Sequence, residues 1–356
     1  MKLLSNPLLS NTYVYNQDVL SGYAVLSIQA SKSVGLQVGG RMEHTNIDGN
    51  SGAGNAEQLS VKNNYTNFIP SFAISKNLSP VQTLRLSYSK RIQRPSLQYL
   101  NPFKDISNDR FQRQGNPNLS PEISQTVELG FSTMIKKSMI NTSVYFRHTT
   151  DIIESIARPD TYEGKPVTLT TFDNIGNNNS IGTSLFGSIV PLKGATLRGN
   201  FDIFTYKPST GSSFTELAGE AKTYALYKAF VSGSFTLPNN LIAETFFILN
   251  SPRRTFQGRN PSFNMWQLSL NRQFLNKKAK IGINVVDPFN ETKHFKSSIK
   301  SAELTQQSDF GIPFRSVGLN FSYQFGKTNF NPQPKKKRGV NNDDLKQDSG
   351  QQGTGN

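Results

Sequence analysis

The side chains that most often perform chemistry are few and far apart in this sequence. Its three histidines, His44, His148 and His294, form no recognised metal-ligand spacing, and there is no cysteine to act as a nucleophile or a metal ligand. The nucleophile elbow G-x-S-x-G, the phosphate loop G-x-x-x-x-G-K and the dinucleotide fingerprint G-x-G-x-x-G are absent. We therefore predict no catalytic residue, no metal site and no cofactor, and we expect that the protein is not an enzyme.

Two sets of side chains remain as candidates for binding. The first set mixes cations with aromatics between residues 94 and 122 and comprises Arg94, Tyr99, Phe103, Arg110, Phe111 and Arg113. Loops held by a rigid scaffold commonly bind ligands, so this set is the candidate ligand loop, although an anionic surface would explain its cations equally well. The second set lies on polar faces of predicted strands and comprises Arg41, Glu43, Arg85, Arg91, Glu128 and Arg147. For it we favour an interior network of paired charges over ligand binding.

The elements that must position these side chains are β-strands. Apolar and polar residues alternate with period two through residues 20–30, 84–91, 126–132 and 140–147, whereas helical spacing hardly occurs. No apolar run reaches the roughly 18 residues that a transmembrane helix needs. A transmembrane β-barrel stays possible, because only alternate residues of each strand face lipid.

Short and long connections alternate along the chain. Short turns are predicted near residues 31–33, 77–82, 135–138, 191–194, 237–240 and 275–278. Long polar loops are predicted near residues 48–64, 94–122, 154–167, 207–221, 255–262 and 288–311. The pattern predicts an all-β protein, an antiparallel meander transmembrane β-barrel of about 13 strands, the last at residues 314–325. Bacterial single-chain barrels usually have an even number of strands, so we expect further strands before this sequence.

The ends and the charge of the chain refine this organisation. Residues 1–326 are predicted to form the barrel, and residues 327–356, which include the basic run Lys335–Arg338, a disordered basic and polar periplasmic tail. The N-terminus lacks a signal peptide, so we expect the sequence to begin inside a longer chain. The net charge of +15 is spread through turns and loops rather than gathered in one stripe, so nucleic acid is not an expected partner.

One 40-residue stretch carries the most specific pattern. Arg91–Ser96 reads R-I-Q-R-P-S, Gly115–Glu122 reads G-N-P-N-L-S-P-E and Glu128–Gly130 reads E-L-G. Gly115 is expected to supply a backbone turn that other residues cannot adopt. Together these motifs resemble the best-marked part of TonB-dependent receptor barrels, within the outer membrane protein beta-barrel family. The resemblance extends over nearly the whole chain through Gly40–Glu43, Tyr145–Ile153 and Asn284–Asn290.

The resemblance implies a receptor or transporter in the cell outer membrane that takes up a scarce ligand, such as a metal chelate, an oligosaccharide or a peptide. Full barrels of this class have 22 strands around a plug, so the chain would be an incomplete, open C-terminal portion that lacks the plug. Implied partners are outer-membrane lipid and lipopolysaccharide, a TonB-type energy complex acting through the missing N-terminal part, and the barrel-assembly machinery, for which Phe325 would end the signal strand. Two alternatives stay open: a plugless adhesion or assembly barrel, and a soluble all-β binding protein whose apolar faces pack against a second sheet.

Overall fold

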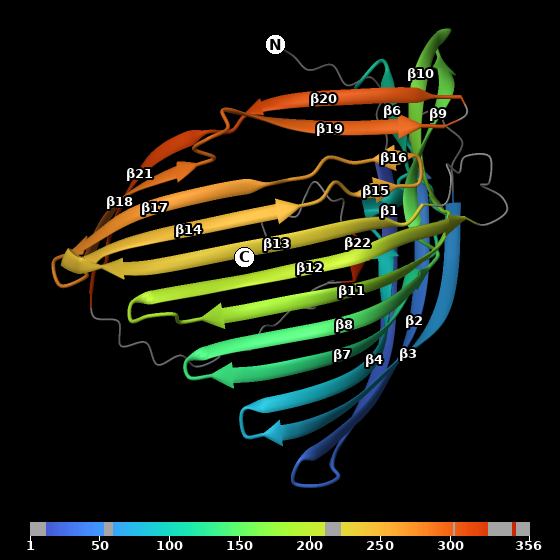
Figure 1. The fold of residues 1–356 in the computed structure, drawn as a ribbon. Helices are drawn as coiled ribbons and strands as arrows, with labels where there is room; N and C mark the ends of the chain where they lie inside the picture. Colours follow the sequence, from blue (N-terminus) through green and yellow to red (C-terminus); the bar gives the residue numbers. More distant parts are fainter. Residues whose placement is uncertain (1–11, 53–59, 211–221, 302, 327–343, 347–356) are drawn as a thin grey trace.

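One large antiparallel sheet dominates the computed structural model, which describes residues 12–52, 60–210, 222–301, 303–326 and 344–346 (Figure 1). Thirteen strands follow one another in chain order, which confirms the predicted meander. They are β1 (Thr12–Gln29), β2 (Val34–Gly52), β3 (Ser60–Ser79), β4 (Gln82–Pro95), β7 (Glu122–Ile135), β8 (Ser138–Thr150), β11 (Gly176–Ile189), β12 (Ala195–Thr210), β13 (Tyr224–Leu237), β14 (Leu241–Asn250), β17 (Met265–Phe274), β18 (Ala279–Val286) and β21 (Ser316–Tyr323).

The alternation seen in the sequence gives this sheet an apolar face that is exposed. Leu86, Phe146 and Phe321 have 43%, 46% and 67% of their surface accessible. A water-soluble protein rarely exposes contiguous apolar area on this scale, whereas the lipid-facing band of a barrel does so by design. The exposure of these side chains means that no described element packs over them, as a second sheet would have to do.

The connections between the described strands lie at two opposite rims of the sheet. The short ones lie on one rim, here called the turn rim, and the long ones lie on the opposite rim, here called the loop rim. At the turn rim, Asn239 and Asn240 of the 3-10 turn η2 (Pro238–Asn240) have φ of 59° and 57°, a conformation that asparagine tolerates better than most residues. The predicted alternation of short turns and long connections is confirmed, although β2 and β3 extend through residues 48–52 and 60–64, which were predicted to be loop. Residues 53–59 and 211–221 of the predicted loops lie outside the described residues.

The long connections contain more regular structure than the sequence indicated. One four-stranded sheet has the order β5 (Lys104–Asp105), β6 (Phe111–Gln114), β10 (Lys165–Asn174), β9 (Ile153–Tyr162). A second has the order β15 (Arg254–Thr255), β16 (Gly258–Arg259), β19 (Thr292–Lys300), β20 (Thr305–Pro313). Both lie at the loop rim (Figure 1). The prediction of plain loops at residues 154–167 and 288–311 is therefore wrong, because these segments find strand partners within and across connections.

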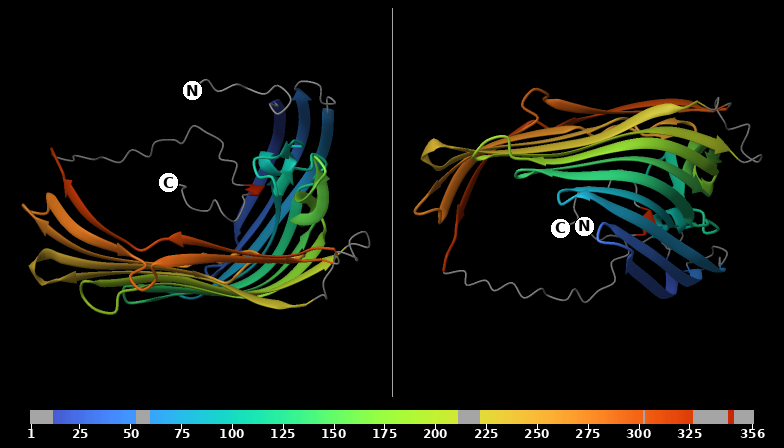
Figure 2. Two further views of the ribbon diagram at one scale, coloured as in Figure 1. Left: turned by 90° about the horizontal axis from the view of Figure 1, so that it is seen from above. Right: turned by 60° about the horizontal axis from the view of Figure 1, so that its bottom comes forward.

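The described sheet is open, as expected. β1 pairs with β2 and β21 pairs with β18, and in the part of the chain that the structure describes neither has a partner on its other edge. Figure 2 shows the sheet curving around an open side. No helix among the described residues is long and apolar enough to cross a membrane.

Three residues of the C-terminal segment are described, and they contact the sheet. β22 (Leu345–Lys346) pairs in parallel with the end of β4. Lys346 is 6% exposed and forms an ion pair with Glu122. For these residues the expectation of a disordered tail does not hold, because two buried charges meet there. The rest of the predicted tail lies outside the described residues.

Candidate ligand-binding site

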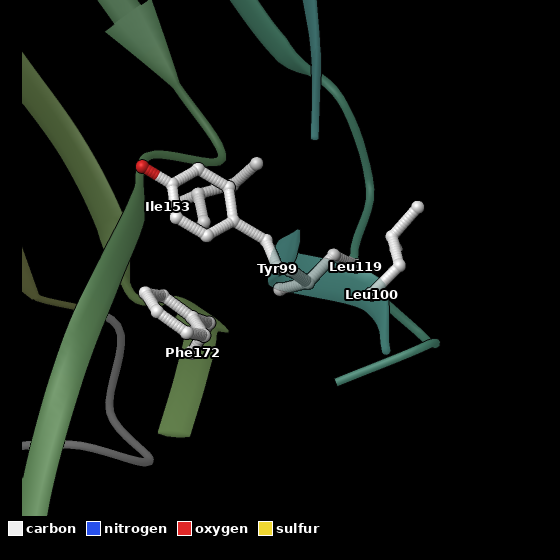
Figure 3. Close-up of a cluster of buried hydrophobic side chains, with 5 residues drawn as sticks. All are labelled: Tyr99, Leu100, Leu119, Ile153 and Phe172. Carbon is white, nitrogen blue, oxygen red and sulfur yellow. The ribbon is translucent and has the colours of Figure 1, made fainter. Parts of the chain in front are cut away.

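A small apolar core fixes the connections at the loop rim. It joins the short helix α1 (Leu97–Leu100) to the β8–β11 connection and consists of Tyr99, Leu100, Leu119, Ile153 and Phe172, each with at most 6% of its surface exposed (Figure 3). The rings of Tyr99 and Phe172 have centroids 4.5 Å apart and are tilted by 42°. Burying each such side chain stabilises the folded state by roughly 1.5–3 kcal/mol, so these two connections behave as one folded body.

Gly115 lets the backbone come close to α1. Its N–H donates to the carbonyl of Asn101 at 2.7 Å, and the N–H of Asn116 donates to the carbonyl of Tyr99 at 2.7 Å. A Cβ atom on Gly115 would lie 2.4 Å from the Asn101 oxygen and 2.7 Å from the Tyr99 oxygen. Gly115 does not have a positive φ, so the predicted reason for this glycine was wrong: the position requires space rather than an unusual turn.

A pocket of about 310 Å³ opens beside this core. Three aromatic side chains line it, from Tyr99, Phe111 and Phe172. The guanidinium of Arg113 lies 4.7 Å from the centre of the Phe172 ring, within the range of a cation–π contact. The size is at the lower end of the range typical of small-molecule sites, about 300–1,000 Å³.

Gln112 gives this pocket an unused pair of hydrogen-bonding atoms. The residue is 2% exposed and lines the pocket, yet neither its amide nitrogen nor its amide oxygen has a hydrogen-bond partner. Leaving a buried polar group unpaired costs about 1–3 kcal/mol. Both amide atoms are almost fully covered, so a ligand that pairs with them and removes this cost would have to displace a neighbouring side chain.

The other side of the pocket carries opposite charges. Glu154 is 3% exposed, accepts a hydrogen bond from the Tyr206 hydroxyl at 3.2 Å and lies 3.4 Å from a guanidinium nitrogen of Arg253. Burial raises the pKa of Glu154, and the positive charges of Arg253 and Lys346 oppose that rise. Among the described residues no group of three or more His, Asp or Glu side chains could hold a metal ion. The pocket therefore offers both charges and an amide to a polar ligand.

The structure divides the six residues of the candidate ligand loop. Tyr99, Phe111 and Arg113 line the pocket. Arg94, Phe103 and Arg110 do not, and Arg94 is instead buried in an ion cluster. Gln112, Glu154, Phe172 and Arg253 were not predicted. Gln112 could have been found from its place between two chosen residues, but the other three come from distant connections and carry no local signal.

The second predicted set is only partly assembled. Arg41 and Arg94 both contact the buried carboxylate of Glu43, each with a nitrogen 2.6 Å from one of its oxygens. Arg94 also donates to the Thr45 hydroxyl at 3.3 Å. Four other members form no ion pair within the described part of the chain: Arg85, Arg91, Glu128 and Arg147. The charges therefore form a local cluster around Glu43 rather than a continuous network.

The fold and the site together define a class of protein. The sheet is a long antiparallel meander with an exposed apolar face. Short turns lie on one rim, and folded connections surround a polar pocket on the other. This is the architecture of an outer-membrane β-barrel. The chain belongs to the outer membrane protein beta-barrel family, whose model matches residues 2–323. It is thus a multi-strand barrel protein of the outer membrane, and the alternative of a soluble all-β protein is contradicted.

Solved structures of similar fold include two receptors and a transporter. The ferric yersiniabactin uptake receptor FyuA from Yersinia pestis has a TM-score of 0.64 and 15% identity, covering 89% of this chain and 47% of its own. The ferric-catecholate import receptor Fiu from E. coli K12 has a TM-score of 0.60 and 12% identity, covering 88% and 45%. The copper transporter OprC has a TM-score of 0.58 and 14% identity, covering 88% and 49%. At these identities the likeness shows the fold, and the chain spans less than half of each; no curated protein matches the sequence.

Proposed function

We propose that the chain is the barrel portion of a receptor that takes up a scarce ligand across the outer membrane, driven by a TonB-type energy complex. The observation that carries the proposal is the unpaired amide of the buried residue Gln112 in the loop-rim pocket. The names of the structural neighbours, which refer to ferric chelates and copper, support it. The ligand classes to test are metal chelates, oligosaccharides and peptides.

The lining of the pocket fits a compact polar ligand with one flat or apolar part. The ring of Phe111, which is 52% exposed, offers a stacking surface, while Gln112 offers one donor and one acceptor. In the same proposal the Arg41–Glu43–Arg94 cluster holds the register of the barrel wall and does not contact ligand, because its charges already satisfy one another.

Replacing Gln112 with leucine is expected to weaken ligand uptake about tenfold to a hundredfold, because one to two hydrogen bonds made by a buried group are lost. The measurement is accumulation of labelled ferric chelates, copper, oligosaccharides and peptides in cells that express the complete receptor of which this chain is proposed to be the barrel portion. It is made with and without a protonophore that removes the driving force for energy coupling.

Gln82→Leu is the matched control, because it makes the same substitution at a half-buried glutamine of β4 that lies at the turn rim, away from the pocket. An equal decrease in uptake in both variants, or uptake that the protonophore does not reduce, would contradict the proposal. Loss of uptake in Gln112→Leu alone supports it.

Phe325 is proposed to end the signal strand that the barrel-assembly machinery recognises. It is 83% exposed, and its ring centroid lies 4.6 Å from that of Tyr323. Phe325→Ala is therefore expected to slow assembly several-fold, measured as the rate at which the heat-modifiable folded band forms in cells. Phe310→Ala, which alters a phenylalanine that is 62% exposed in β20 at the loop rim, should assemble at the normal rate; equal rates for Phe325→Ala and the unaltered chain would count against the signal.

A further inference from the structure

β3 and β4 separate toward the loop rim. β4 pairs with β3 only from Gln82 to Ser89, whereas on its other edge it pairs with β7 as far as Gln93. The end of β4, residues 90–95, therefore has one edge without a β3 partner. We call this region the β3–β4 fork. Unpaired backbone N–H and C=O groups on such an edge are a template for an additional strand.

β22 pairs with β4 at the tip of this fork, at residues 94–95, which have neither a β3 nor a β7 partner. Leu345 lies opposite Arg94 and Lys346 opposite Pro95 in parallel register, and the N–H of Arg94 donates to the Asp344 carbonyl at 2.7 Å. Figure 2 shows β22 on the concave side of the sheet. An extended chain covers about 3.3 Å per residue, so the 21 residues from Tyr323 to Asp344 can reach about 70 Å, while β4 with its 14 residues spans about 46 Å. The chain is thus long enough to connect the turn rim to this place.

Two ion pairs set the direction and sequence of the docked segment. The guanidinium of Arg94, itself 2% exposed, binds the carboxylate of Asp344 as well as that of Glu43. The ammonium of Lys346 binds the Glu122 carboxylate and the Ile153 carbonyl. Residues i and i+2 of a strand project to the same side, so an acid followed two residues later by a lysine matches the spacing of these two partners.

The acceptor for the lysine is built into the fold. Glu122 is 6% exposed and accepts the backbone N–H of Ile153 at 2.6 Å, which fixes its carboxylate between β7 and β9. The negative charge of Glu154 acts on Lys346 as well. Without the lysine these buried carboxylates would lose a positive partner, and uncompensated buried charge is strongly unfavourable.

From these contacts we infer that the β3–β4 fork is a docking slot for an extended Asp-x-Lys segment, and that residues 344–346 of the chain are its resident occupant. Because Lys346 also lines the loop-rim pocket, the docked tail competes with ligand there. This second consequence rests on the proposed function, whereas the docking itself does not.

The absence of cysteine makes the docking directly measurable. Leu345→Cys introduces a single thiol into the full chain, and a nitroxide attached there in detergent micelles reports tail mobility by electron paramagnetic resonance. The docked label should give an immobilised spectrum. Adding Lys346→Gln should lower the ratio of docked to free tail at least about tenfold, and adding Asp344→Asn should lower it less, since Asp344 is more exposed than Lys346.

Lys336→Gln is the matched control, because it removes the same charge from the basic run of the tail. All these substitutions lie outside the barrel strands, so we expect the barrel to fold in every variant. A change in label mobility then reports the docking of the tail. A label that is mobile in every variant, or that responds equally to Lys336→Gln and Lys346→Gln, would overturn the docking.

Uptake measured in Lys346→Gln cells tests the competition separately. A gain of several-fold is expected if the tail and the ligand share the pocket. A tail that is immobilised in the unaltered chain, together with uptake in Lys346→Gln cells that equals uptake with the unaltered chain, would overturn the competition. Normal uptake in Gln112→Leu cells would show instead that the proposed receptor function is wrong.

Discussion

Replacing Gly115 with alanine is expected to release α1 and its core from the loop rim. The added Cβ would overlap the backbone of Asn101 and Tyr99, and backbone atoms cannot move aside as the end of a side chain can. The two hydrogen bonds that Gly115 and Asn116 make to α1 would lengthen. Overpacking of this kind costs about 3 kcal/mol, which corresponds to about a hundredfold increase in the open state of this segment.

Trypsin cleavage after Arg113 measures this opening, because Arg113 lies in β6 and is protected while the loop sheet is folded. Gly22→Ala provides the control, since a Cβ on Gly22 would meet no atom within 4 Å. Cleavage rates that agree between Gly115→Ala and Gly22→Ala would show that the close approach at α1 does not hold the connection in place.

The purified 356-residue chain is expected to associate through its sheet edges and to give no uniform single-channel conductance. β1 and β21 are the first and last of thirteen alternating strands, so they run in the same direction and could close only through a parallel seam. In hydrocarbon each unsatisfied backbone group costs several kcal/mol. β1 alone presents an edge of 18 residues, and such edges recruit other chains.

Light scattering in detergent and bilayer recording on the same preparation test this expectation together. Association should appear as a mass of at least two chains, and conductance should be absent or variable in size. A monomeric preparation with one stable conductance would show that thirteen strands close into a pore unaided.

The sequence predicted the large sheet because each strand carries its own signal. In residues 84–91, for example, the alternation alone fixes which side chains share a face, and β4 forms there. The loop sheets have no such signal, because polar composition hides the alternation. Thr168 of β10 pairs with Phe111 of β6, and only the folded chain brings these residues together.

The same limit applies to the candidate site. Arg94 had the composition expected of a ligand contact, but it pairs with Glu43, which lies 51 residues earlier. Conversely, Phe172 and Glu154 looked unremarkable in sequence and line the pocket. Composition pointed to a connection that borders the pocket, whereas long-range contacts decide which of its residues line that pocket.

The folded connections at the loop rim also bear on how fast and how selectively a ligand would bind. Ordering a loose loop costs about 1–2 kcal/mol of backbone entropy per residue, and a site assembled from loose loops incurs that cost at every encounter. Here Tyr99 and Phe172 are already held by a shared core, and β6 and β10 are already paired. A preorganised pocket of this kind can bind a small ligand tightly with few contacts. Because its backbone is already folded, the site also cannot change shape around a different ligand. A molecule of the wrong shape therefore dissociates without forming a stable complex.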